Sequence, residues 1–83
     1  MNYRLSLELD AVHFLFAVSI SNRRALMRWL EQLKSAPFSK GKSIVHDSTG
    51  REIQVSIFSH FRIFHWTDHP VETVRVVDIE LND

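Results

Sequence analysis

His65 is the residue whose type and surroundings best suit proton transfer. Two segments of alternating polar and apolar residues, 51–58 and 61–66, flank a two-residue turn at 59–60. Pairing them as a hairpin sets Gln54 beside His65, and we expect this pair on an open face of a sheet. Because histidine is the commonest general acid or base, His65 is the leading candidate for that role. The alternative is a hydrogen-bonded strand residue with a structural role.

Five further side chains could stabilise or bind negative charge such as that of a phosphate. Arg62 and Arg51 are the candidates for stabilising charge during catalysis. The hairpin register puts Arg62 on the apolar side near a strand end, where it could contact a phosphate or pair with an acid. Lys40 and Lys42 precede the predicted sheet, and with Arg51 they could form a basic rim that binds phosphates. His60, in the hairpin turn, is a further candidate, and solvated loop charges are the alternative.

Other classes of site are not expected. His65 and His69 are four residues apart with Asp68 between them, which suits metal ligands on a helix, but this stretch is predicted as strand and turn. No Ser-His-Asp arrangement and no phosphate-binding glycine loop occurs, so we expect neither a metal nor a cofactor. The absence of cysteine rules out disulfides and favours the cytoplasm. No apolar run long enough to span a membrane and no secretory signal is present.

The charge balance differs between the two halves of the chain. Ten basic side chains face ten acidic ones over 83 residues, for a net charge of zero. Residues 1–42 hold seven basic and three acidic side chains, a balance of +4, and residues 43–83 hold three and seven, a balance of −4. A neutral total argues against a general nucleic-acid binder. The two halves could pair with each other or face different partners.

The first 42 residues predict one strand and two helices. Apolar residues alternate with polar ones over 3–9, which predicts a strand. Asp10 could cap a short helix over 11–19, although a second strand there is the alternative. Ser21 or Asn22 then caps a longer helix that runs to Lys34, with its apolar residues facing inward. Three arginines on its outer surface form either a solvated face or a surface for an acidic partner segment: Arg23, Arg24 and Arg28.

The rest of the chain predicts an antiparallel meander of three or four strands packed on the helices. The strands are 43–46, 51–58, 61–66 and 71–81, separated by turn residues. In the central hairpin, Phe58 opposes Phe61, Val55 opposes Phe64 and Ile53 opposes Trp66, and we expect the face of Val55 to pack on the helices. The last strand changes phase after Val76, which indicates a bulge or a strand covered on both faces. The chain is therefore predicted to be a single α+β domain over 1–83.

The order of these elements resembles that of the RelE/ParE-type toxins of bacterial toxin–antitoxin modules. The residues that carry the resemblance are LELDA at 7–11, which looks like the first strand running into a helix, and RRALMRWLEQLKSAP at 23–37, which looks like the second helix with its terminating proline. FRIFHW at 61–66 looks like the family's "YRIxY" strand, and 74–79 resembles its closing strand. The similarity covers nearly the whole chain.

The resemblance implies a toxin-like component of a type II toxin–antitoxin pair. RelE-like members cut mRNA on the ribosome without a metal, ParE-like members act on DNA gyrase, and both are inhibited by an antitoxin. Arg62 matches a family position, whereas the family's strand lysine falls near Gln54 and the chain stops at Asp83, where RNA-cutting relatives carry further basic residues and a tyrosine. The expected activity is therefore that of an mRNA endoribonuclease or of a diverged, inactive form.

The expected partners are a cognate antitoxin, the ribosome with its mRNA, and a second copy of the chain. Two alternatives remain at this stage. One is a non-enzymatic protein-interaction module of the same fold, and the other is a gyrase-directed inhibitor.

Overall fold

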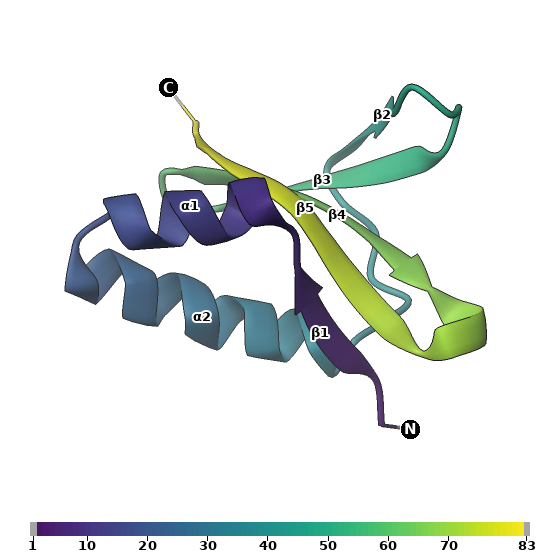
Figure 1. The fold of residues 1–83 in the computed structure, drawn as a ribbon, viewed down its shortest axis with the longest axis horizontal. Coiled ribbons are helices and arrows are strands. Elements are labelled where there is room, and N and C mark those ends of the chain that lie inside the picture. The colour runs from purple at the N-terminus through teal and green to yellow at the C-terminus, as the bar shows by residue number, and fades with distance from the viewer. Residues whose placement is uncertain (1, 83) are drawn as a thin grey trace.

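Two helices lie on one side of a five-stranded sheet (Figure 1). The computed structural model describes residues 2–82. The sheet order is β1-β5-β4-β3-β2; β1 runs parallel to β5 and the other neighbours are antiparallel. The elements follow the order β1 (Arg4–Leu7), α1 (Leu9–Ala17), α2 (Ile20–Lys34), β2 (Ser43–His46), β3 (Glu52–Phe58), β4 (Phe61–Asp68), a 3₁₀ turn (His69–Val71) and β5 (Thr73–Leu81). The predicted α+β fold, with a four-stranded antiparallel meander, is confirmed.

The segment after β1 is helical, so the alternative of a second strand is wrong. Helix α1 already begins at Leu9, and Asp10 lies in its first turn instead of capping it. Ala11 and Leu15 are buried in the core, as the helical spacing predicts. The first strand ends at Leu7 because Leu9, which is 67% exposed, belongs to the helix.

Helix α2 is held at its start by a serine that the sequence did not single out. The Ser19 hydroxyl accepts a hydrogen bond from the Asn22 N–H at 3.3 Å, so the cap lies two or three residues before the one predicted. Leu26, Leu30 and Leu33 are buried as expected. The helix ends at Lys34, shortly before Pro37.

The predicted hairpin register is confirmed, but the predicted face is wrong. Val55 pairs with Phe64 and Gln54 with His65. The helices cover the other face, where Phe14 of α1 contacts Phe61 and Trp29 of α2 stacks on Phe58. Both faces of this hairpin are rich in apolar residues, so period-two alternation alone could not tell which one the helices cover.

A β-bulge in the last strand is confirmed. Phe64 pairs with Asp78, and the next residue, His65, pairs with Val76, so Val77 is the extra residue. The bulge explains the phase change, because it allows Val76 and then Ile79 to face the same helix-covered core. The last strand begins at Thr73, after the 3₁₀ turn, and not at 71.

No helix among the described residues is long and apolar enough to cross a membrane.

Candidate functional site

A cleft of about 410 Å³ opens between the loop that follows α2 and the neighbouring ends of β3 and β4. Three aromatic rings, two cationic side chains and one carboxylate, that of Glu52, line it, together with neutral polar groups of the loop and the strands. Its main lining residues are Phe38, Lys40, Arg51, Gln54, Trp66 and His69. An open cleft that combines rings with cations suits a ligand that has both an aromatic part and an anionic part.

Arg51 and Arg75 flank the indole ring of Trp66. The Arg51 guanidinium carbon lies 3.9 Å from the centre of the ring and that of Arg75 lies 5.7 Å away. Arg75 is the β5 residue that pairs with Trp66 of β4, so the sheet register fixes this neighbour. A cation over an indole ring contributes about 0.5–2 kcal/mol, depending on its exposure.

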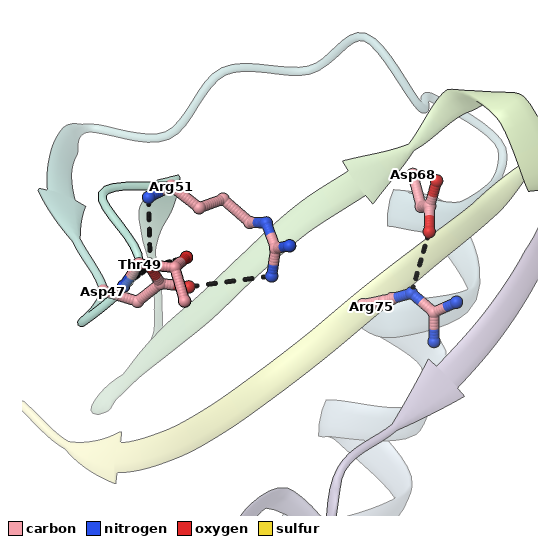
Figure 2. Close-up of polar contacts among 5 residues, drawn as sticks. All are labelled: Asp47, Thr49, Arg51, Asp68 and Arg75. Carbon is pink, nitrogen blue, oxygen red and sulfur yellow. Dashed lines mark hydrogen bonds and ion pairs between the residues drawn. The ribbon is translucent and has the colours of Figure 1, made fainter.

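Each of these arginines is held by an aspartate, as Figure 2 shows. Arg51 pairs with Asp47 at 3.6 Å in the β2–β3 turn, and Arg75 pairs with Asp68 at 3.3 Å across β4 and β5. Asp47 also accepts hydrogen bonds from the Thr49 hydroxyl at 2.6 Å and from the backbone N–H groups of Thr49 and Arg51. The Thr49 hydroxyl bond is the main reason that the pKa of Asp47 lies below its usual value. The turn therefore presents an ionised Asp47 that orients Arg51.

His69 is a further lining residue of the cleft. Its ring stacks on Phe38, with centroids 4.7 Å apart, and its Nδ1 is hydrogen-bonded to the Tyr3 hydroxyl at 2.8 Å. Phe38 is 66% exposed, so much of its ring is open to solvent. Because Nδ1 is already bonded, Nε2 is the ring nitrogen left for a ligand.

Two hydrogen bonds hold the loop that carries Phe38 and Lys40. The Thr67 hydroxyl donates to the Pro37 carbonyl at 2.9 Å, and the Gly41 N–H donates to the Gln54 side-chain oxygen at 2.6 Å. Gln54 thus anchors this loop to β3, in addition to lining the cleft.

His65 does not lie on an open face, contrary to the expectation from sequence. It is 2% exposed beneath α2, where its ring and that of Trp29 are arranged edge to face, and its Nε2 is hydrogen-bonded to the Ser56 hydroxyl at 2.7 Å. Burial lowers the pKa of His65 to about 4. A neutral imidazole under a helix cannot reach a substrate, so the structural alternative describes His65 better.

The other predicted site residues do not form one group: some lie near the cleft, and others lie near the β3–β4 turn at the far end of this hairpin. Lys40 and Arg51 come together in the cleft. Arg62 lies four residues before Trp66 on β4, about 13 Å away by strand geometry, and pairs with Glu80 at 3.0 Å. His60 lies in the β3–β4 turn, at the same far end as Arg62. Lys42 is exposed just before β2 and does not line the cleft.

The sequence did not point to Phe38, Trp66, Arg75 and His69 as members of one site. The only signal was the unusual segment 66–70, Trp-Thr-Asp-His-Pro, which a turn alone also explains. In the sequence, His69 stands out only through its metal-ligand spacing from His65, whereas in the structure His65 is buried in the core and His69 lines the cleft. Within residues 2–82, no cluster of three His, Asp or Glu side chains could hold a metal ion.

The chain resembles known proteins in its structure and not in its sequence. No family model and no curated protein matches it by sequence. It superposes on a chain of the RelE–RelB complex from Pyrococcus horikoshii with a TM-score of 0.77 at 12% identity, covering 99% of this chain and 97% of that one. It also superposes on a chain of the RelBE2 toxin–antitoxin complex from Mycobacterium tuberculosis, with a TM-score of 0.80 at 15% identity, covering 98% of this chain and 99% of that one. With the isolated RelE toxin of E. coli the TM-score is 0.70 at 13% identity, and the match covers 98% of this chain and 85% of that one. At these identities the likeness concerns the fold, and at that level the resemblance found in the sequence is confirmed.

Proposed function

We propose that this chain, whose fold is that of the RelE toxins, is the toxin of a type II toxin–antitoxin pair and acts on RNA through its cleft. The observation that carries the proposal is the match over 98–99% of the chain to RelE structures, two of which are complexes with an antitoxin. The proposed partner is therefore a cognate antitoxin.

The contents of the cleft support RNA as the target. The exposed ring of Phe38 is a surface on which a base can stack, which is worth about 1–3 kcal/mol per base. Lys40 and Arg51 are cations that suit the phosphate next to such a base. Trp66 keeps the guanidinium of Arg51 in the cleft.

The side chains of the cleft also suit cleavage of the RNA backbone without a metal. Such cleavage requires removal of a proton from a 2′-hydroxyl, stabilisation of the extra charge on the phosphate, and protonation of the leaving 5′-oxygen. Nε2 of His69 is the proposed proton carrier, and Lys40 and Arg51 are the proposed charge stabilisers. The proposal keeps Arg51 from the sequence-based site and moves the acid–base role from His65 to His69.

Inducing the chain alone in a bacterial host tests this function. We expect growth to stop and to resume when the protein encoded by an adjacent short reading frame is co-expressed. His69→Gln should abolish the arrest, whereas His13→Gln, at an exposed position on α1, should retain it. Unimpaired growth together with intact mRNA would sink the proposal.

A non-enzymatic interaction module of the same fold is the second candidate, and a specific observation favours it. The three arginines of the sheet and its turn, at positions 51, 62 and 75, are each paired with a carboxylate. Ion pairs of this kind reduce the positive potential that RNA would meet. This candidate predicts binding to a partner protein with no arrest of growth and no cut in any mRNA.

A further inference from the structure

Strand β2 forms an open edge of the sheet. It is the last strand in the order β1-β5-β4-β3-β2, so among residues 2–82 it pairs with β3 on one side and with no strand on the other. Figure 1 shows it away from both helices. All four of its residues are exposed, including Ile44 at 46% and Val45 at 42%. The strand therefore offers both its free backbone groups and two β-branched apolar side chains to a further strand.

The hydrogen-bonding pattern of the β2–β3 hairpin determines which backbone groups of β2 face outward. The Asp47 N–H donates to the Arg51 carbonyl at 3.0 Å, which makes these two residues a hydrogen-bonded pair. Because such pairs alternate along an antiparallel ladder, Val45 is the next β2 residue bonded to β3. Ile44 and His46 therefore direct their N–H and C=O groups away from β3. No loop, turn or cap hydrogen bond in the described part of the chain uses these groups.

The sequence of β2 does not oppose pairing at this edge. Residues 43–46 contain no proline, lysine or acidic residue, which are the residue types that commonly prevent edge strands from pairing. Charges lie just outside the strand instead, with Lys42 before it and Asp47 after it. The segment 42–47 thus has a basic start and an acidic end. An antiparallel copy of the same segment complements this charge.

We propose that β2 pairs antiparallel with β2 of a second copy of this chain, in a register that puts Val45 opposite Val45 of the other copy. In this register Ile44 lies opposite His46 of the second copy, so the outward backbone groups of both residues hydrogen-bond across the two-fold axis. The two sheets then form one continuous sheet. Because each copy contributes the same strand, the contact uses up both edges and closes at two chains.

The same register connects the dimer to the cleft. It puts Ser43 opposite Asp47 of the second copy, on the face of the sheet that carries Val45. Asp47 is the ionised carboxylate that pairs with Arg51 at 3.6 Å. The Ser43 hydroxyl of one copy donates a hydrogen bond to Asp47 of the other. Each chain therefore helps to hold the arginine that lines the cleft of the second copy.

Sedimentation equilibrium of the purified chain tests the pairing. Two strands of four residues bury less than the roughly 1,000 Å² of a stable interface, so the dimer is weak. The weight-average mass should rise from that of one chain at about 10 µM towards that of two chains at about 1 mM. A chain that stays monomeric at the higher concentration, or a mass that continues to rise past two chains, would overturn the inference.

Variants of β2 locate the contact. Val45→Lys sets like charges opposite each other on the two-fold axis and should raise the dissociation constant of the dimer at least about tenfold. Ser43→Ala removes the hydrogen bond to Asp47 at both ends of the paired strands and should raise it about tenfold. Val71→Lys is the matched control, since Val71 has a similar exposed fraction, 45%, but lies in the 3₁₀ turn. Circular dichroism checks that each variant is folded. Equal dimerisation of Val45→Lys and Val71→Lys would show that β2 is not the contact.

Hydrogen exchange followed by NMR distinguishes self-pairing from other uses of this edge. The amides of Ile44 and His46 should exchange more slowly at about 1 mM than at about 10 µM, whereas that of Val45, which is already bonded to β3, should not change. Protection of Ile44 and His46 only after addition of the protein encoded by the adjacent short reading frame would assign the edge to that protein and overturn the inference. These measurements involve neither RNA nor growth, so their outcome is independent of the proposed function.

Discussion

The Arg51 guanidinium lies 3.9 Å from the centre of the Trp66 ring and also pairs with Asp47 at 3.6 Å. Arg51 belongs to the β2–β3 turn and Trp66 to β4, so the contact depends on how this turn lies against the sheet. This contact brings a cation from an exposed turn into the cleft, where it meets Lys40. The candidate site therefore depends on the conformation of one turn.

Replacing Arg51 tests this relationship directly. Arg51→Ala removes the cation, the ring contact and the ion pair, so we expect the free energy of unfolding to fall by about 1 kcal/mol and RNA cleavage to fall about 10–100-fold. Arg51→Lys keeps the charge but loses the planar stacking, so its activity should be intermediate. Urea unfolding and a cleavage assay measure the two effects.

Arg24→Ala is the control for Arg51, because Arg24 is an exposed residue of α2 that does not line the cleft. It should cleave RNA as the unmodified chain does. If Arg62→Ala abolishes cleavage while Arg51→Ala does not, the site lies at the other end of β4 and the assignment to the cleft is wrong.

His65 should make stability depend on pH. Burial lowers its pKa from 6.5 to about 4, so the unfolded chain binds a proton more readily than the folded chain. Its contribution is fully present above pH 6.5 and is lost progressively as the pH falls to 4, and it amounts to about 3 kcal/mol. Urea unfolding at pH 7.5 and pH 4 measures the loss.

Variants isolate the part of this pH dependence that belongs to His65. His65→Gln keeps a polar side chain without a titratable ring, so its stability should fall about 3 kcal/mol less between pH 7.5 and 4 than that of the unmodified chain. His13→Gln, at an exposed site, should leave the dependence unchanged. An unaltered dependence in His65→Gln would show that the buried imidazole is not responsible.

Gly41 is required because the loop at the cleft passes very close to β3. A Cβ atom on Gly41 would lie 2.6 Å from the Val55 carbonyl oxygen and 2.7 Å from its backbone nitrogen. Gly41→Ala must shift the loop, so we expect a loss of about 2 kcal/mol or more in unfolding free energy and weaker RNA binding.

Gly50→Ala provides a matched comparison in the β2–β3 turn. Nothing lies within 4 Å of a Cβ at this position, but the backbone has φ of +85°. We expect a loss of about 1 kcal/mol from conformational strain alone. If Gly41→Ala costs no more than Gly50→Ala, the close approach of the loop to Val55 is not a constraint.

Local sequence features were enough to predict the hairpin but not its orientation. The two-residue turn at 59–60 determines that Val55 pairs with Phe64, because loop length sets the register. Which face the helices cover depends on packing against Phe14 and Trp29, and no local pattern encodes that choice. The wrong prediction that His65 lies on an open face of the sheet followed from the wrong choice of the face that the helices cover.

The candidate site was less predictable because its residues come from separate segments. Arg51 and Lys40 were identified by charge. Phe38 and His69 come together only because Thr67 and Gln54 anchor the loop after α2 to the sheet. Such anchoring depends on side-chain hydrogen bonds between distant residues, and sequence periodicity carries no information about these.

Mapping the 5′ ends of a translated reporter mRNA after induction tests the central claim most directly. The account predicts new ends within the coding region for the unmodified chain and for His13→Gln, and none for His69→Gln or Arg51→Ala. An intact reporter in cells whose growth has stopped, or the same ends in all four strains, would contradict the claim that this chain cleaves RNA through its cleft.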